Sequence, residues 1–266
     1  MAVVVLASAS GSPGVTATAV GLASVWPRPV LLVDADPVGG QSILAGFFQG
    51  RLPAGGGLGE VALGQRSGDL AGAIAASAVA LPGTQAHVLP GACGHLAAQA
   101  LKGLWPPLLA QLRALEATGQ DVVVDAGRLG MEGSPEPLIY GADLALLVMG
   151  SSLRAMSGAR SWAKAWRATF DDVGAGSTAP VALVVGPGRP YGGKEIASVL
   201  PIAVLGSLPW DPAGAAVFAD GAQPGRRFAS GPLMRALTQT REAMSARLRG
   251  PDLQVRSADG VEAGSR

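Results

Sequence analysis

The stretch Val3-Val-Val-Leu-Ala-Ser-Ala-Ser-Gly-Ser-Pro-Gly-Val-Thr16 decides the fold, because it joins a predicted strand to a predicted helix through a glycine-rich turn. The apolar run Val3–Leu6 is typical of a strand buried on both faces. A helix is expected over Thr16–Val25. Backbone N–H groups in such a turn can approach an anion, and the helix dipole adds positive potential. A plain strand-to-helix turn also favours Gly and Pro, so that alternative stays open.

Short apolar runs continue to alternate with helix-like stretches along the chain. Further strands are predicted at Val30–Val33, Val122–Val124, Leu144–Val148 and Val181–Val185, with weaker candidates at Ala86–Leu89 and Ala203–Leu205. Further helices are predicted at Leu104–Thr118, Arg154–Phe170 and Gly231–Arg249. This alternation predicts an α/β fold, in which a mainly parallel, twisted sheet carries helices on both faces.

Length, charge and cysteine content limit the class of protein. The 266 residues carry 20 basic and 19 acidic side chains, a net charge of +1, which argues against a broad nucleic-acid-binding surface. The single cysteine, Cys93, cannot form an internal disulfide and fits a reducing compartment. No basic segment precedes the first apolar run, so no secretory signal is predicted and a cytoplasmic location is expected. A metal pair of Cys93 and His95 is conceivable but disfavoured.

The alternation of strands and helices predicts one domain over residues 1–249. The stretch from Pro53 to Gly59 is rich in glycine and is expected to be a surface loop within that domain. Residues 250–266 are polar, contain Pro251 and lack apolar periodicity, and they are predicted to be a disordered tail.

Two later strands end in aspartate. Val30-Leu-Leu-Val-Asp-Ala-Asp-Pro37 places Asp34 and Asp36 two residues apart, so they face the same way if the strand continues. Asp121-Val-Val-Val-Asp-Ala-Gly-Arg128 places Asp125 at the end of another strand. The carboxyl ends of parallel strands line the ligand crevice of open α/β sheets, and a carboxylate there commonly holds Mg²⁺. Each motif alone is equally compatible with an ordinary strand end.

Taken together and in this order, the three motifs resemble those of the MinD/ParA family of deviant Walker ATPases. The family's phosphate loop is similar to Ser10-Gly-Ser-Pro-Gly-Val-Thr-Ala17, its second carboxylate motif to Val33-Asp-Ala-Asp-Pro37, and its Walker B strand to Val122-Val-Val-Asp125. Its late strand, acidic loop and final helix resemble three later segments: Val204–Pro212, Ala219–Pro224 and Ser230–Ala236. The resemblance covers about residues 1–249 and implies the three-layer sandwich of P-loop NTPases.

The resemblance also implies a role for individual residues. ATP would be bound by the loop residues and one later arginine: Gly11, Ser12, Gly14, Val15, Thr16, Ala17 and Arg128. Mg²⁺ would be held by Thr16, Asp34 and Asp125. Asp36 would be catalytic, because it stands where the family orients the attacking water. Arg128 enters as a hypothetical replacement for a missing cation, with a solvated loop residue as the alternative, and Arg189 is a similar candidate near the base.

The chain departs from the family pattern at both phosphate-loop lysines, where it has Ser10 and Val15. Charge-assisted contacts are worth ~1.5–3 kcal/mol each, so losing two would weaken nucleotide binding by a few orders of magnitude. Phosphoryl transfer depends on neutralising charge and would suffer more. The asparagine that contacts adenine in the family is not evident either, because Val184-Val-Gly-Pro-Gly188 stands there. The phosphate loop is therefore predicted to be degenerate.

The resemblance implies a role in spatial organisation, such as positioning a pilus or secretion apparatus, a septum or a chromosome. Phosphate loops without lysine occur in the CpaE/TadZ-like pilus-assembly branch. A protein partner is expected, and a nucleotide-dependent homodimer is a further expectation. Arginines in the last predicted helix leave two further alternatives open, contact with DNA and contact with the inner face of the membrane. The near-zero net charge favours a protein partner. An aromatic stripe at Trp162, Trp166 and Phe170 would suit a partner if exposed, but its spacing favours inward packing.

Two alternatives remain at this point. One is an active Mg-ATP-dependent ATPase of the MinD/ParA family. The other is an NAD(P)-binding oxidoreductase, in which Asp34 would meet a ribose. Against the second, Gly11 and Gly14 do not make G-x-G-x-x-G, and Tyr191 and Lys194 are one residue short of the Tyr-x-x-x-Lys spacing.

Overall fold

The computed structural model describes residues 2–10, 12–52, 56–173 and 179–249, and the described strands form one sheet of order β3-β4-β2-β5-β1-β6-β7-β8. All neighbouring strands run parallel except β3, which pairs with β4 in the antiparallel sense. The strands are β1 (Val3–Ser8), β2 (Val30–Asp34), β3 (Val79–Ala80), β4 (Ala86–Leu89), β5 (Asp121–Arg128), β6 (Leu144–Gly150), β7 (Val181–Val185) and β8 (Ala203–Leu208).

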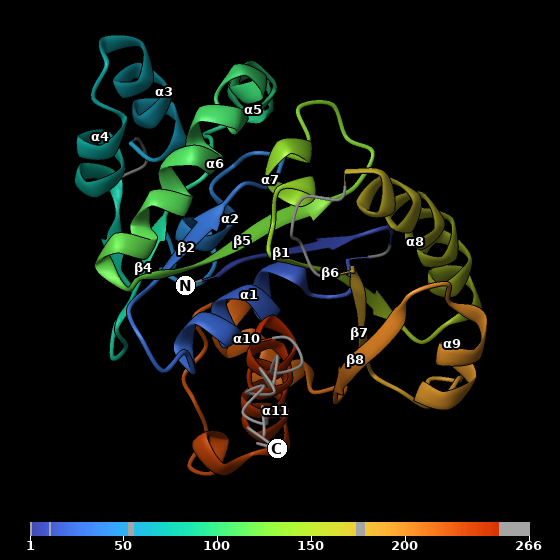
Figure 1. Ribbon diagram of the computed structural model, residues 1–266. Helices are drawn as coiled ribbons and strands as arrows, with labels where there is room; N and C mark the ends of the chain where they lie inside the picture. Colours follow the sequence, from blue (N-terminus) through green and yellow to red (C-terminus); the bar gives the residue numbers. More distant parts are fainter. Residues whose placement is uncertain (1, 11, 53–55, 174–178, 250–266) are drawn as a thin grey trace, which may run out of the picture.

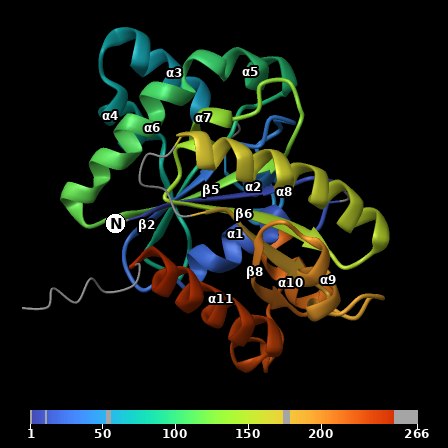
Figure 2. The ribbon, with the colours of Figure 1, turned by 45° about the vertical axis from the view of Figure 1, so that its right-hand side comes forward.

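Helices cover both faces of the sheet and make three layers (Figures 1 and 2). One face carries α3 (Leu58–Ser67), α4 (Leu70–Ser77), α5 (His95–Gln99), α6 (Trp105–Ala114), α7 (Glu136–Tyr140), α8 (Leu153–Val173) and α9 (Gly193–Val199). The other face carries α1 (Val15–Ser24), α2 (Ser42–Ala45), α10 (Pro212–Ala219) and α11 (Pro232–Leu248). Short 3₁₀ turns are Ala100–Gly103, Leu115–Thr118 and Phe228–Ser230.

Two apolar clusters, one on each side of the sheet, form the core. Successive side chains of a strand point to opposite faces, so Val3 and Val5 join one cluster while Val4 and Leu6 join the other. These four side chains are fully buried, which explains why the strand is a continuous apolar run rather than an alternating one.

The predicted fold class is confirmed: the sheet is mainly parallel and lies between two layers of helices. The loop prediction over Pro53–Gly59 is wrong at its end, because α3 begins at Leu58, whose buried side chain packs into the core. Residues 250–266 lie outside the described residues, and so does the tail predicted there. No helix in the described part of the chain is both long and apolar enough to cross a membrane.

The predicted aromatic stripe packs inward, as its spacing favours. Trp166 and Phe170 are buried, and Trp162 is half-buried against the same cluster. On α11, Leu233 and Leu237 are likewise buried against the sheet. The stripes on both helices are therefore occupied by the core.

The strand order argues against the oxidoreductase alternative. In the Rossmann fold β1 pairs directly with β2, whereas here β5 lies between them and pairs with both. The Asp34 carboxylate thus has the neighbouring strand β5 beside it, where Asp125 is its register partner. The oxidoreductase alternative loses its structural basis.

Candidate functional site

The predicted site residues gather at one edge of the sheet. Strands β1, β2 and β5 run parallel, so their carboxyl ends meet there, and they carry the glycine-rich loop, the Asp34–Asp36 pair and Asp125. Arg128, the last residue of β5, pairs in register with Ser8 at the end of β1, beside the start of the loop. The sequence motifs therefore converge in space.

The loop ends in a left-handed glycine that starts α1. Gly14 has φ 90° and precedes Val15, the first helical residue, and Ser12 is also left-handed with φ 46°. Only glycine adopts this conformation at no steric cost, which explains its place before the helix. Gly11 lies outside the described residues. The Thr18 N–H donates to the Gly14 oxygen (2.9 Å), closing the first turn of α1.

The two positions that hold lysine in the family pattern do not offer a cation to the site. Val15 is 6% exposed, and its side chain belongs to the apolar cluster beneath α1. Ser10 is half-buried beside α8, and a Cβ atom on Gly158 would lie 3.1 Å from its hydroxyl oxygen. At the start of α1, Val15 therefore contributes apolar burial and no charge.

Asp34 and Asp125 form a buried carboxylate pair. They are register partners on β2 and β5, and they are 2% and 0% exposed. The Gly127 N–H donates to Oδ1 of Asp125 (2.9 Å), but Oδ2 of each aspartate has no hydrogen-bond partner within the described residues. Buried carboxylates are normally paired, so two unpartnered oxygens at a strand end indicate a place for a cation or a polar ligand.

Burial and neighbouring carboxylates raise the pKa of both carboxyls. Burial, followed by the charges of Asp125 and Asp36, raises the pKa of Asp34 to about 7. Burial also raises the pKa of Asp125 to about 6, although the Thr16 side chain and the Gly127 N–H oppose the rise. Strongly perturbed carboxyls in a crevice are typical of functional sites.

Asp36 lies next to this pair. Its Oδ1 accepts from the Val38 N–H (2.9 Å), and burial raises its pKa. It packs so closely on Gly127 that a Cβ atom there would come within 2.3 Å of the Asp36 Cγ. The glycine, with φ 59°, is thus required for the second carboxylate motif and the end of β5 to meet.

The donor set fits Mg²⁺ better than it fits a triphosphate. Mg²⁺ takes oxygen ligands, typically one or two carboxylates with waters and phosphate oxygens, and Thr16, Asp34 and Asp125 supply hydroxyl and carboxylate oxygens. No group of three His, Cys, Asp or Glu side chains among the described residues is arranged to hold a metal by itself. Mg²⁺ would therefore depend on ligands that the chain does not provide, while the phosphates would meet no lysine.

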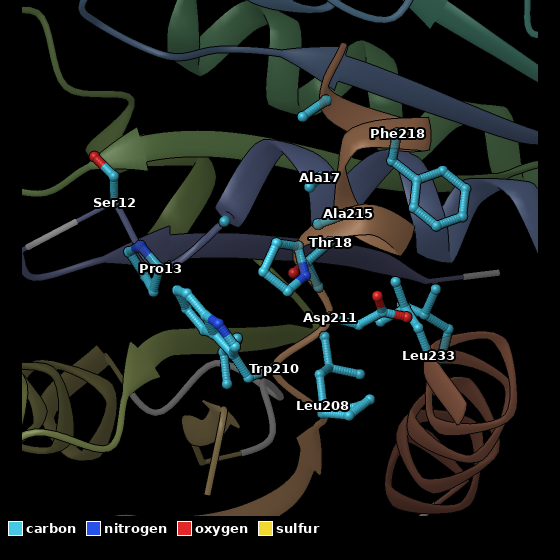
Figure 3. Close-up of a pocket in the computed structure, with 16 residues that line it drawn as sticks. Ser12, Pro13, Ala17, Thr18, Leu208, Trp210, Asp211, Ala215, Phe218 and Leu233 are labelled. Atoms are coloured by element: carbon cyan, nitrogen blue, oxygen red, sulfur yellow. The ribbon is translucent and has the colours of Figure 1, made fainter. Parts of the chain in front are cut away.

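A cavity of about 230 Å³ adjoins the loop, between α1, α10, α11 and the ends of β7 and β8. Figure 3 shows Trp210 beside Pro13 at one end, and Phe218 and Leu233 at the other. The lining is mostly apolar, and Asp211 uses its Oδ1 to accept from the Gly214 N–H (2.9 Å) at the start of α10.

Trp210 lines this cavity, and Arg189 stacks on the Trp210 ring. Trp210 is 56% exposed, and the Arg189 Cζ lies 5.1 Å from the centre of its ring. Val185, at the end of β7, also lines the cavity. Arg189 is thus stacked on an aromatic ring rather than extended toward the phosphate loop.

Comparisons with known proteins find no matching family model and no matching curated protein sequence. Several solved structures do match along nearly the whole chain. MinD from Pyrococcus horikoshii, complexed with Mg-ADP, is 17% identical with a TM-score of 0.68, and the match covers 94% of this chain and 97% of that one. A ParA-family ATPase from Chlorobium tepidum is 14% identical with a TM-score of 0.69, covering 91% and 97%. A single-residue variant of Cyanothece McdA, in complex with ATP, is 20% identical with a TM-score of 0.65, covering 92% and 96%.

The chain has the MinD/ParA fold. This confirms the resemblance inferred from the motifs, and at these low identities it does so for the fold alone. Within the MinD/ParA fold of this chain, Asp34, Asp36 and Asp125 come together with Thr16, while Val15 turns away into the core.

Sequence reasoning missed the residues that line the cavity at the MinD/ParA loop. Leu208, Phe218 and Leu233 come from three separate elements. Leu208 was expected in the late-strand segment and Leu233 in the last helix, whereas Phe218 lay in no predicted element. The segment Leu208-Pro-Trp-Asp211 carried the available signal, because an aromatic residue follows a strand end there. Arg128 is exposed and makes no hydrogen bond or ion pair within the described residues, so its proposed pairing with phosphate stays a hypothesis.

Proposed function

We propose that this chain is a MinD/ParA-like P-loop protein of spatial organisation whose ATP binding and hydrolysis are weak or lost. The observation that carries the proposal is Val15, an apolar side chain packed in the core at the position where the family pattern has a lysine. With Ser10 at the other lysine position, the loop offers no lysine to a triphosphate. The fold remains intact, which favours a role as a positioning or scaffold subunit.

The role consists in placing a pilus or secretion apparatus, a septum or a chromosome, through a protein partner. A solved neighbour of this chain is the MinC:MinD cell division protein complex of Aquifex aeolicus, 17% identical, which supports a partner protein in general. A peripheral place at the inner face of the membrane, in the cytoplasm, completes the proposal, and a nucleotide-dependent homodimer belongs to the second candidate below, which binds ATP. The CpaE/TadZ-like branch is the variant in which loss of the loop lysines is expected.

An active Mg-ATP-dependent ATPase is the second candidate. It is supported by the grouping of Asp34 and Asp125 with Thr16 around two unpartnered carboxylate oxygens, and by Asp36 beside them. In that case Thr16, Asp34 and Asp125 would hold Mg²⁺, which would offset phosphate charge, and Asp36 would orient the attacking water. Arg128 would then supply the missing cation.

Calorimetric titration with Mg-ATP, paired with a turnover assay, separates the two candidates. The proposed function predicts a dissociation constant above the micromolar range and no turnover that depends on Asp36. Micromolar binding, together with turnover abolished by Asp36→Ala, would sink the proposal and establish the ATPase.

Restoring the charge gives a sharper version of the experiment. Val15→Lys should tighten ATP binding by about tenfold or more, since a charge-assisted contact is worth ~1.5–3 kcal/mol. Val15→Met is the matched control, because it lengthens the side chain without adding charge. If both variants bind ATP alike, the missing charge is not what limits binding. Arg128→Ala tests the compensating cation in the same titration.

A further inference from the structure

A second hollow lies between α8 and α9, on the face of the sheet opposite α1. It is a groove of about 890 Å³ lined by one stripe of α8 and by the chain that leaves α9. The stripe runs from Leu153 to Lys164, along which an α-helix rises about 16 Å. The full lining is Leu153, Met156, Ser157, Arg160, Ser161, Lys164, Ser198, Val199 and Pro201.

The middle of the groove is basic. Arg160 and Lys164 lie one turn apart on α8, both are exposed, and neither has an ion-pair or hydrogen-bond partner within the described residues. No acidic side chain lines the groove. Three serine hydroxyls, at 157, 161 and 198, add hydrogen-bonding groups around the two cations.

Another cation on α8, Arg167, does have partners. Arg167, one turn beyond Lys164, donates to the Pro201 oxygen (3.1 Å) and pairs with Asp171 at 3.9 Å. The acid nearest in sequence on α9, Glu195, uses its Oε2 to accept from the Gly192 N–H (2.7 Å). Arg160 and Lys164 are therefore left with charges that the surrounding helices do not compensate.

Both ends of the groove are apolar. Leu153 is 65% exposed at one end, and Val199 is 47% exposed near Pro201 at the other. Single exposed aliphatic side chains are normal on a protein surface, so these two gain significance only from their place beside the unpaired cations. Two unpaired cations between two apolar ends are complementary to a segment whose acidic residues lie between apolar ones.

We propose that the groove between α8 and α9 binds an acidic, amphipathic segment of a partner protein, with its carboxylates on Arg160 and Lys164 and its apolar residues on Leu153 and Val199. The groove proposal rests on the proposed function for the existence of a partner protein. It adds the surface that the partner binds and the chemistry of the partner's segment. Two cations are too few for the many phosphate contacts that nucleic-acid binding requires, and the apolar ends match no phosphate backbone.

The test uses the full chain and a fluorescein-labelled helical peptide in which leucines flank two turns of glutamate. Fluorescence anisotropy should report micromolar binding of this peptide and at least about tenfold weaker binding of the same peptide with lysine in place of glutamate. The double variant Arg160→Glu/Lys164→Glu should bind the acidic peptide about tenfold more weakly, or weaker still. Because both side chains are exposed, the variant should keep its melting temperature.

Arg226→Glu/Arg227→Glu is the matched control, since it makes the same charge change at two exposed arginines outside the groove. It should bind the acidic peptide as the unmodified chain does. Leu153→Ser tests the apolar end. It should weaken binding of the acidic peptide without altering the salt dependence of that binding.

Three results would overturn the proposal: no binding of the acidic peptide, equal loss in the control variant, or binding of duplex DNA or anionic vesicles that is lost in Arg160→Glu/Lys164→Glu while peptide binding is not. Mg-ATP titration and turnover on the same samples keep the two proposals apart. An active ATPase would contradict the proposed function and leave the peptide result standing, whereas a failed peptide titration would leave the nucleotide result standing.

Discussion

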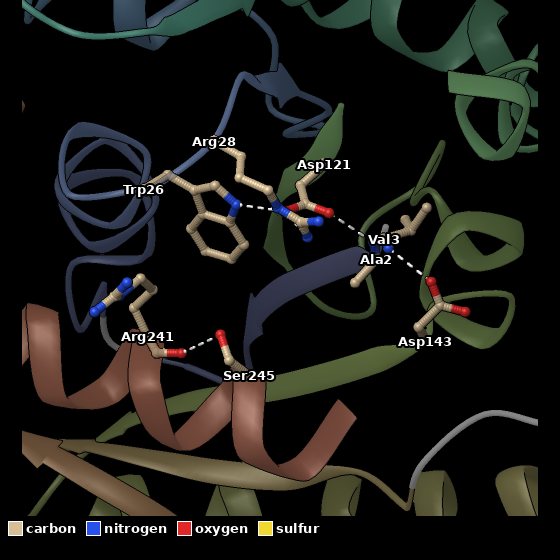
Figure 4. A network of polar contacts seen from close by, with 8 residues as sticks. All are labelled: Ala2, Val3, Trp26, Arg28, Asp121, Asp143, Arg241 and Ser245. Atoms are coloured by element: carbon tan, nitrogen blue, oxygen red, sulfur yellow. Dashed lines mark hydrogen bonds and ion pairs between the residues drawn. The ribbon is translucent and has the colours of Figure 1, made fainter. Parts of the chain in front are cut away.

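The two ends of β5 each hold a buried aspartate, but their surroundings are opposite. Asp121, at the amino end, is 2% exposed and accepts from four donors (Figure 4). They are the Ala2 N–H (2.8 Å), the Trp26 Nε1–H (2.8 Å), and Nε and Nη2 of Arg28 (3.1 and 2.6 Å). Asp125, at the carboxyl end, is fully buried and accepts one backbone bond, while its Oδ2 has no partner in the described part of the chain.

The difference shows what each end of the strand does. At the amino end one carboxylate joins the start of β1, the chain before β2 and the start of β5, so its burial is compensated by donors. At the carboxyl end Asp125 is buried beside Asp34 with fewer hydrogen-bond donors. Burying a carboxylate without enough donors lowers the free energy of unfolding. Buried carboxylates with perturbed pKa values are typical of sites that bind a ligand or an ion.

The largest effect is expected from removing the compensated carboxylate. Asp121→Ala should lower the free energy of unfolding by about 3 kcal/mol, because it leaves the indole, the Ala2 N–H and part of the guanidinium without an acceptor. Urea unfolding followed by circular dichroism measures this change. An unchanged midpoint would show that water replaces the carboxylate at this end.

The carboxyl end should make stability depend on pH. The folded-state pKa of Asp34 is about 7 and that of Asp125 about 6, both above the ordinary value of 3.8, so the folded state binds more protons between these limits. The stabilisation from these raised pKa values is fully present below about pH 4 and is lost as pH rises through 6 and 7, by several kcal/mol in all, since one pKa unit corresponds to about 1.4 kcal/mol. Unfolding curves from pH 4.5 to 8 test this.

The double variant Asp34→Asn/Asp125→Asn is the control for that prediction, and its stability should change little over the same pH range. A fall of the same size in the double variant would assign the pH dependence to other groups.

A smaller effect of opposite sign is expected at Asp125 alone. Asp125→Asn removes a buried charge but keeps an oxygen for the Gly127 N–H, so it should raise the free energy of unfolding at pH 7.5 by about 1–2 kcal/mol. Asp121→Asn should lower it under the same conditions. If both substitutions change stability in the same direction, the contrast between the two ends is wrong.

The smallest effect is expected at Arg28. Its side chain is 53% exposed, so its ion pair with Asp121 is screened by water. Arg28→Ala should lower the free energy of unfolding by about 0.5–1 kcal/mol, since Trp26 and the Ala2 N–H still hold the carboxylate. Added salt should reduce the difference. A loss as large as that of Asp121→Ala would make the arginine, not the backbone and indole, the main partner.

The fold was predictable because its strands are buried on both faces, as at Val3–Leu6, and such runs stand out without any tertiary information. The convergence of Asp34 and Asp125 was also predictable, since parallel strands end at one edge. The start of α3 was missed because glycines at 55 to 57 and 59 favour a loop, whereas the burial of Leu58 against the core decides for helix.

Tertiary partners could not be predicted. Asp121 was expected only as the first residue of a strand, because its donors at Ala2, Trp26 and Arg28 lie between 93 and 119 residues away. The replacement of lysine by Val15 was plain in the sequence, but its burial was not, since that depends on the packing of α1 on the sheet. The groove between α8 and α9 likewise arises from two helices that the sequence does not show to be adjacent.

The packing of Val15 has a consequence for how the glycine-rich turn behaves in time. Val15, the first residue of α1, is packed in the core, so we expect the start of α1 to be ordered without a bound ligand. The Thr18 amide, bonded to the Gly14 oxygen, should therefore exchange slowly with solvent in the protein alone. A partner protein would then bind the start of α1 in a single conformation, and nucleotide binding would change that conformation little.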